Sequence, residues 1–208
     1  MSFKNSQPAL TLLPEWAEQE AVILAWPNPD TDWKPWLVDV QATYISLISA
    51  INDANAIVVL LCREQELGLI KSLIPYRAKV LCVTCEYNDT WARDYAFLTC
   101  ESADGNVPVS FRFNGWGQKF DAAKDDKVNQ LVLADLCQHP MQYCDIVAEG
   151  GALEIDQNQH LISTRSCLFN ELRNGELSEE EYVDIFTQQL GAQKISIFEH
   201  GHLEGDDT

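Results

Sequence analysis

Basic residues are scarce in this sequence, and the imbalance limits what the protein can bind. The 208 residues include 14 Lys and Arg against 32 Asp and Glu, for a formal net charge of −18. Nucleic-acid phosphates would be repelled by such a surface, so nucleic acid is excluded as a partner. An acidic cleft would attract a cationic small molecule, although solubility alone also accounts for an acidic composition.

Long hydrophobic runs are absent as well. Because no stretch of about 18 apolar residues occurs, the sequence predicts no transmembrane helix and no membrane partner. Residues 1–14 lack the basic start and apolar centre of a signal peptide. Together these absences indicate a cytoplasmic protein.

The cysteines do not form a recognisable pairing pattern. There are seven, an odd number, and without a signal peptide they do not predict a disulfide framework. Cys82 and Cys85 have CxxC spacing, but residues three apart on the strand predicted there point to opposite faces. No second CxxC follows, so we expect neither a zinc site nor a redox pair. The other cysteines are interpreted as small core residues.

The sequence has no Ser/Gly linker and no low-complexity tract, which favours a single domain. Short apolar strands alternate with amphipathic helices, a pattern typical of a mixed α/β fold with central strands and outer helices. Strands are predicted over residues 21–26, 56–62, 78–85, 95–100, 107–113, 143–148, 152–155, 160–164 and 194–198. Helices are predicted over residues 36–54, 63–74 and 124–137, and from a capping box at Ser178 to Gly191.

The segment from Asn88 to Asp94 surrounds a tryptophan and an arginine with carboxylates. The Asp94 carboxylate could accept two parallel hydrogen bonds from a guanidinium, because the two groups match in geometry. The Trp91 indole could wall an alkyl chain or face a cation. Alternatively, Arg93 and Asp94 form a surface ion pair beside a half-buried Trp91. Arg93 has no further role that the residues indicate.

Two glycine-containing segments are further candidates for a site. Residues 113–117 read Phe-Asn-Gly-Trp-Gly, and the glycines permit backbone conformations closed to other residues. Asn114 and Trp116 could therefore line a pocket, or they could belong to a packed loop. Residues 149–151 read Glu-Gly-Gly at the end of an apolar strand. Glu149 either projects into a cleft or is a solvated turn residue.

The last nine residues carry two histidines and three carboxylates. His200 and His202 could share one face of a strand, and with Asp206 they form a metal-site candidate. This interpretation predicts a metal-dependent hydrolase that a chelator would inactivate.

These segments, in this order, resemble the agmatine deiminase and microbial peptidyl-arginine deiminase family. The similarity runs from residues 13–16 and 25–27 to Asp207, and residues 163–174 resemble a family pattern, SCLLNxxRN. The family has the pentein fold, a five-bladed α/β-propeller of repeated ββαβ units. The resemblance implies one pentein-type catalytic domain over residues 1–208, with about three blades present and the C-terminal side missing.

The resemblance also implies roles for individual residues. Asp94 would bind the substrate guanidinium, and Glu149 would orient a catalytic histidine. Trp91, Trp116 and Asn114 would line the substrate pocket.

The remaining parts of the family's site fall at the end of the chain or past it. Asp207 would hold the distal amine of agmatine. The histidine base and the cysteine nucleophile would lie beyond Thr208, so the chain alone is expected to be inactive. Cys167 is not assigned as the nucleophile, because no histidine is spaced to activate it.

The implied reaction is hydrolysis of a non-peptide C–N bond in a linear amidine, without a metal or organic cofactor. Agmatine would give N-carbamoylputrescine and ammonia through a covalent cysteine intermediate, a step of polyamine biosynthesis leading to putrescine. Peptidyl-arginine and free arginine are competing substrates. An amidinotransferase and a non-catalytic fragment that only binds guanidines are the alternatives within the same resemblance. A homo-oligomer is compatible with the sequence, which leaves the oligomeric state open.

Overall fold

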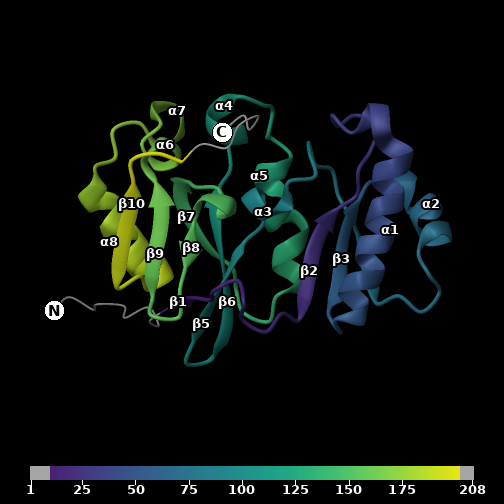
Figure 1. The fold of residues 1–208 in the computed structure, drawn as a ribbon, viewed down its shortest axis with the longest axis horizontal. Helices are drawn as coiled ribbons and strands as arrows, with labels where there is room; N and C mark the ends of the chain where they lie inside the picture. Colours follow the sequence, from purple (N-terminus) through teal and green to yellow (C-terminus); the bar gives the residue numbers. More distant parts are fainter. Residues whose placement is uncertain (1–9, 202–208) are drawn as a thin grey trace.

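The computed structural model describes residues 10–201 and arranges their strands in three sheets that lie side by side (Figure 1). The first sheet lies at one end of the molecule, the second in the centre and the third at the other end. This arrangement confirms the predicted α/β class. None of the helices in this range is long and apolar enough to cross a membrane.

The first sheet is entirely parallel, and helices connect its strands. Its members are β2 (Ala21–Ala25), β3 (Ile57–Cys62) and β4 (Val80–Thr84), connected by α1 (Leu37–Asp53) and α2 (Leu67–Leu73). Short 3-10 turns precede the two helices at Lys34–Trp36 and Glu64–Glu66. Both helices lie on the outer side of the sheet (Figure 1).

The central strand of this sheet shows why its sequence is apolar throughout. Val58 and Leu60 of β3 pack against α1 and α2, whereas Val59 and Leu61 pack toward the middle of the molecule. A parallel strand that is covered on both faces has no solvated side, so it needs no polar alternation. The prediction that Cys82 and Cys85 point to opposite faces is confirmed, because Cys82 packs on the helix side and Cys85 on the opposite side.

The central sheet is mixed. Its order is β1 (Thr11–Leu12), β5 (Leu98–Ser102), β6 (Gly105–Arg112) and β7 (Gln142–Val147). β5 and β6 form an antiparallel hairpin, and β7 pairs with β6 in parallel. The connection from β6 to β7 contains the short α4 (Gly115–Gln118) and a helical stretch that begins with α5 (Asp125–Val128).

The third sheet contains β8 (Glu154–Ile155), β9 (His160–Thr164) and β10 (Lys194–Phe198). Between β9 and β10 lie three helices, α6 (Arg165–Leu168), α7 (Glu171–Asn174) and α8 (Glu179–Leu190). The capping box predicted at Ser178 is present, because its side chain and that of Glu181 exchange hydrogen bonds with each other's backbone N–H. Gly191 ends α8 in a left-handed conformation, with φ of 67°.

The predicted ββαβ unit occurs in two of these three sheets. The central sheet runs β5, β6, helical connection, β7, and the third sheet runs β8, β9, helices, β10. The first sheet differs, since its three strands alternate with helices as βαβαβ. The closed propeller and its number of blades stay predictions.

Three predicted elements differ in the structure. Of the strand expected over residues 152–155, only Glu154–Ile155 is strand, because residues 150–152 form a 3-10 turn. The strand expected over residues 95–100 begins only at Leu98, because residues 92–95 form the helical turn α3 (Ala92–Tyr95). Tyr95 is buried like a strand residue, but its hydroxyl donates to the carbonyl of Asp89 at 3.1 Å and closes a turn. The helix expected over 124–137 is helical but changes type, with a π-helical turn over residues 129–133 and a 3-10 turn over 134–136.

Asn129, at the start of the π-helical turn, connects this stretch to the strands beside it. Its buried side chain donates to the carbonyl of Tyr95 and to Ser110 Oγ, both at 2.8 Å, and accepts from the N–H of Phe97 at 3.1 Å. The Asn129 amide thus provides hydrogen-bond partners for the carbonyl of Tyr95 and the N–H of Phe97. Neither of these backbone groups pairs with a strand of the described chain. π-Helical turns commonly occur where a side chain has such a specific task.

We expect Asn129→Ala to lower the free energy of unfolding by about 3 kcal/mol or more, because buried polar groups on three residues lose their partner. Urea denaturation would measure the change. Asn158→Ala, in an exposed turn, is the control and should lie within about 0.5 kcal/mol of wild type. Equal stability of the two variants would contradict the role given to Asn129.

Candidate active site

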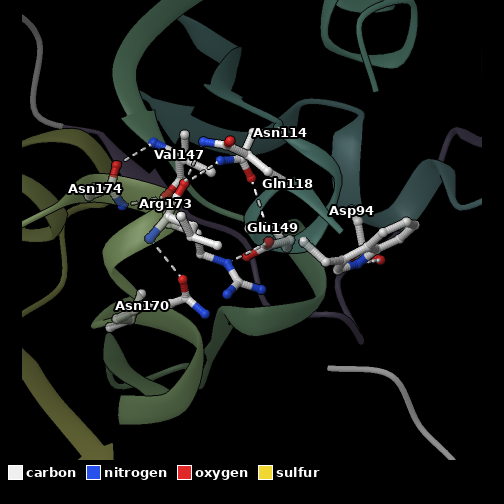
Figure 2. A network of polar contacts seen from close by, with 12 residues as sticks. Asp94, Asn114, Gln118, Val147, Glu149, Asn170, Arg173 and Asn174 are labelled. Carbon is white, nitrogen blue, oxygen red and sulfur yellow. Dashed lines mark hydrogen bonds and ion pairs between the residues drawn. The ribbon is translucent and has the colours of Figure 1, made fainter. Parts of the chain in front are cut away.

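The residues singled out in the sequence come from loops that follow the carboxyl ends of four strands. The segment from Asn88 to Asp94 follows β4, residues 113–117 follow β6, Glu149 follows β7, and α7 follows β9. Figure 2 shows that these segments meet in one polar network. A rigid set of strands that presents loops in this way is a common scaffold for binding and catalysis.

Asp94 lies at the junction of two of the segments. Its Oδ1 accepts a hydrogen bond from the backbone N–H of Gly151 at 3.0 Å, and its Oδ2 accepts from the indole N–H of Trp116 at 3.2 Å. Burial raises the pKa of Asp94, the two hydrogen bonds lower it, and the nearby charge of Glu149 raises it. The structure therefore brings Asp94 and Trp116 together, and Glu149 lies close enough for its charge to raise the pKa of Asp94.

The Glu-Gly-Gly segment needs its glycines because it packs directly against the backbone beside Asp94. A Cβ on Gly150 would collide with the carbonyl oxygen of Arg93, and a Cβ on Gly151 would collide with the Asp94 carboxylate. Only glycine permits this approach at both positions. The close contact turns a loop N–H into a fixed donor to Asp94.

Glu149 is buried and paired with an arginine. Its Oε1 accepts from Nε of Arg173 in α7 at 2.7 Å, and both side chains are only 5% exposed. The interpretation of Glu149 as a solvated turn residue is therefore wrong. A charge removed from water to this extent requires a partner of opposite sign.

The Asn114 side chain forms hydrogen bonds with the main chain of two neighbouring segments. Its Oδ1 accepts from the N–H of Gly117 at 2.9 Å, and its Nδ2 donates to the carbonyl of Leu172 at 2.8 Å. Gln118 Nε2 donates to the same carbonyl at 3.3 Å, so α4 docks on α7 through one main-chain oxygen. Asn114 thus orders the loop that carries Trp116.

Trp116 is held from several sides. Its backbone has a positive φ of 56°, which is uncommon for a tryptophan and is stabilised by the docked loop around it. Its ring packs edge-on against Phe113 and Phe120, with centroids 5.1 and 5.7 Å away. The indole N–H is consequently fixed in its direction toward Asp94.

Trp91 is 51% exposed, unlike Trp116. Its carbonyl accepts from the N–H of Asp94 at 3.0 Å, so the two residues share a turn. About half of the indole surface is therefore open to solvent.

Arg93 does not pair with Asp94. Its guanidinium contacts Glu15 at 2.8 Å and Glu154 at 3.1 Å, and these three residues line a cleft of about 780 Å³ to which Asp94 does not contribute. The alternative of an Arg93–Asp94 surface ion pair is therefore wrong.

The loop that precedes Trp91 is held by a buried carboxyl. Asp125 accepts from the N–H of Asn88 at 2.6 Å, while Asn88 Oδ1 accepts from the N–H of Lys124 at 2.8 Å. The pKa of Asp125 is raised to about 7, mainly by burial. The hydrogen bonds from Asn88 and Asp89 oppose this rise, and the charges of Asp89 and Asp121 add to it.

Other sequence candidates lie apart from this network. Cys167 belongs to α6, and its sulfur forms no hydrogen bond within the described part of the chain. Among residues 10–201, no group of three or more His, Cys, Asp or Glu could hold a metal ion. His202, Asp206 and Asp207 lie outside the described residues, so the metal-site candidate and the expected amine partner stay untested.

Sequence reasoning missed the part played by α7. Residues 163–174 stood out only as a family-like pattern, and the Arg-Asn pair at its end was given no task. The signal was available in the need of a buried Glu149 for a cation, but the sequence could not show that Glu149 is buried.

The pKa of Asp125 generates a prediction on stability. A carboxyl with a raised pKa binds its proton more tightly in the folded state, so its contribution to stability is present below about pH 4 and is lost as pH rises through about 7. Asp125→Asn keeps the accepting oxygen without the charge. Relative to wild type, this variant should gain at least about 1 kcal/mol between pH 5 and pH 8. Urea denaturation at both pH values measures the gain. If the difference in stability between the variant and the wild type is the same at pH 5 and pH 8, the assigned pKa is contradicted.

Comparison with known proteins extends this picture over the whole chain. Residues 11–208 match the family of Porphyromonas-type peptidyl-arginine deiminases. The agmatine deiminase of Stutzerimonas stutzeri (strain A1501) is 29% identical over 206 residues, which is 93% of this chain and 54% of that protein.

Solved structures have the same fold. A cysteine-to-serine variant of C. jejuni agmatine deiminase with substrate bound is 26% identical, has a TM-score of 0.88 and covers 100% of this chain and 61% of its own. The agmatine deiminase of Enterococcus faecalis has a TM-score of 0.79 at 24% identity, over 91% of this chain and 53% of its own, and supports the fold alone. The chain thus spans between half and two thirds of the length of these proteins. By the match over residues 11–208, the chain belongs to the Porphyromonas-type peptidyl-arginine deiminase family.

Proposed function

We propose that this chain is part of a guanidine deiminase that hydrolyses agmatine to N-carbamoylputrescine and ammonia. Family membership supports the class of reaction. The agmatine deiminases of S. stutzeri and C. jejuni support agmatine as the substrate, and the second of these is solved with substrate bound. The proposal includes a cytoplasmic enzyme of polyamine biosynthesis, with residues 1–208 as the larger part of one pentein domain.

The observation that carries the proposal is the charge of Asp94. Its carboxylate is fixed by two neutral donors, while the adjacent Arg93 pairs with Glu15 and Glu154 instead. Within residues 10–201, no ion pair neutralises Asp94, and burial makes its negative charge costly. A guanidinium would supply the missing cation and form charge-assisted hydrogen bonds with it.

Two tryptophans near Asp94 suit the alkyl part of an agmatine molecule. We propose that Trp91 and Trp116 wall the pocket, because an indole face attracts a cation and an alkyl chain packs well beside it. Asn114 serves the pocket indirectly by ordering the Trp116 loop. Asp207 is proposed to hold the distal ammonium of agmatine.

In the proposed chemistry, a cysteine thiolate attacks the guanidinium carbon, and ammonia leaves with a proton from a histidine. Water then attacks the thioether carbon and releases the urea-type product and the thiolate. Asp94 holds the cation during both steps, and Glu149 orients the histidine. We propose that nucleophile and histidine lie outside residues 1–208, so this chain alone is inactive. Neither step calls for a metal or an organic cofactor.

Peptidyl-arginine is the second candidate substrate, because the matched family is described by that activity. The experiment is to measure ammonia release by the full-length protein from agmatine, free arginine and an arginine-containing peptide. The proposal expects agmatine to have the highest kcat/KM and EDTA to leave the rate unchanged. Ammonia release from the peptide alone would favour the second candidate. Loss of activity with EDTA would favour the metal-dependent hydrolase.

For Asp94, we predict that Asp94→Asn raises the KM for agmatine about 10- to 100-fold, since a charge-assisted hydrogen bond contributes about 1.5–3 kcal/mol. Steady-state ammonia release measures the change. Asp145→Asn is the matched control, because this carboxylate is 98% exposed and only contacts Arg112 at 3.7 Å. If both variants bind agmatine as the wild type does, Asp94 is not the guanidinium partner.

A further inference from the structure

Arg173 has a place in the fold that the proposed reaction does not yet use. It comes from α7, a four-residue helix after β9, and its Nε donates to Glu149 at 2.7 Å (Figure 2). With both side chains 5% exposed, this pair is the most buried ion pair among the residues described. The other ion pairs of the described chain each have at least one side chain that is far more exposed.

The helix that carries Arg173 is anchored beside β7, the strand that precedes Glu149. Asn174 Oδ1 accepts from the N–H of Val147 at 2.8 Å, and its Nδ2 donates to the carbonyl of Val147 at 2.7 Å. The same Nδ2 donates to the hydroxyl of Tyr182 in α8 at 2.8 Å. Val147 precedes Glu149 by two residues, so the neighbouring positions 173 and 174 bind two ends of one short segment.

We propose that Arg173 is a positioning residue for Glu149, and that its buried hydrogen bond holds this carboxylate in the orientation that the catalytic histidine needs. This inference rests on the proposed function, because it concerns the carboxylate that would orient the base. Arg173 itself does not touch the substrate.

The charge argument explains why this position holds an arginine. A carboxylate buried to this extent is costly unless a group of opposite charge pairs with it, and Arg173 supplies that group to Glu149. Arginine stays charged even when buried, and its planar guanidinium fixes the direction of the contact. The Glu149 oxygens therefore have a preset orientation before a substrate enters.

The same helix also sets the other wall of the site. The carbonyl of Leu172 accepts from Asn114 and Gln118, so the loop that aims Trp116 at Asp94 rests on the residue next to Arg173. A displacement of α7 would therefore alter both proposed carboxylate positions together.

The test uses the full-length enzyme and two substitutions, Arg173→Gln and Arg173→Lys. For Arg173→Gln, we expect kcat for agmatine to fall about tenfold or more with little change in KM, as for an interaction needed in the chemical step. Arg173→Lys keeps the charge but loses the planar guanidinium geometry, so its kcat should lie between those of Arg173→Gln and the wild type.

Arg112→Gln is the matched control, since Arg112 is 60% exposed and contacts Asp145 only at 3.7 Å. Its kcat and KM should equal those of the wild type. The proposal is overturned if Arg173→Gln keeps both values as well. It is also overturned if KM alone rises, because Arg173 would then bind substrate.

A folding defect in Arg173→Gln would not end the test. The double variant Glu149→Gln/Arg173→Gln removes both charges, and it should fold better than Arg173→Gln if the defect comes from an unpaired buried Glu149. Equal defects in both variants would overturn the proposal, because the defect would then not arise from the charge on Glu149. Arg173→Lys then supplies the kinetic data.

A second measurement separates this inference from the proposed function. In protein labelled with ¹³C-glutamate, the chemical shift of the Glu149 carboxyl carbon should change more in Arg173→Gln than in Arg112→Gln, because only the first variant removes the hydrogen bond to Glu149. A wild type that releases no ammonia from any guanidine would refute the proposed function, while this chemical shift would still decide whether Arg173 positions Glu149. An unchanged Glu149 signal in Arg173→Gln would overturn the inference.

Discussion

The contact between the Gly151 N–H and the Asp94 carboxylate joins two segments 57 residues apart, and the rest of the site is arranged around it. It requires two consecutive glycines, because any side chain would push the Glu-Gly-Gly loop away from the turn at residues 92–95. This contact fixes the position of the Glu-Gly-Gly loop, so Glu149 at the start of the loop and Asp94 beside it are both held in place. The two carboxylates are thus held close together by backbone geometry rather than by a cation between them. The repulsion that results raises the affinity of the site for a positive charge.

Because basic residues are scarce, the position of each arginine determines which carboxylates have a cationic partner. With 14 basic residues against 32 acidic ones, most carboxylates must remain solvated or rely on neutral donors. Arg93 is directed to Glu15 and Glu154, and Arg173 to Glu149, so neither serves Asp94. This distribution differs from the general acidity of the surface. Surface charge draws cations toward the protein, whereas the two arginine positions decide which buried carboxylate remains to receive one.

Much of the fold could be predicted from sequence periodicity, and much of the site could not. The continuous apolar run of β3, the hairpin of β5 and β6 and the capping box of α8 depend on local patterns, which the sequence displays directly. The turn at residues 92–95 was missed because Tyr95 is buried by tertiary contacts that resemble those of a strand residue. The π-helical turn at Asn129 and the task of Arg173 depend on partners more than twenty residues away, which no local pattern reveals. Asp94, Trp116 and Glu149 were proposed as site residues through a family resemblance, which gave no indication of their hydrogen bonds.

The docking of α4 on α7 has an evolutionary consequence. Asn114 and Gln118 bind the carbonyl oxygen of residue 172, not its side chain, and the Leu172 side chain is 56% exposed. Every amino acid has the same carbonyl, so most exchanges at position 172 would leave the joint intact. We therefore expect position 172 to tolerate most substitutions, whereas position 173 requires the side chain that pairs with Glu149. A helix of four residues can in this way change its solvent-facing chemistry while it continues to hold both walls of the site.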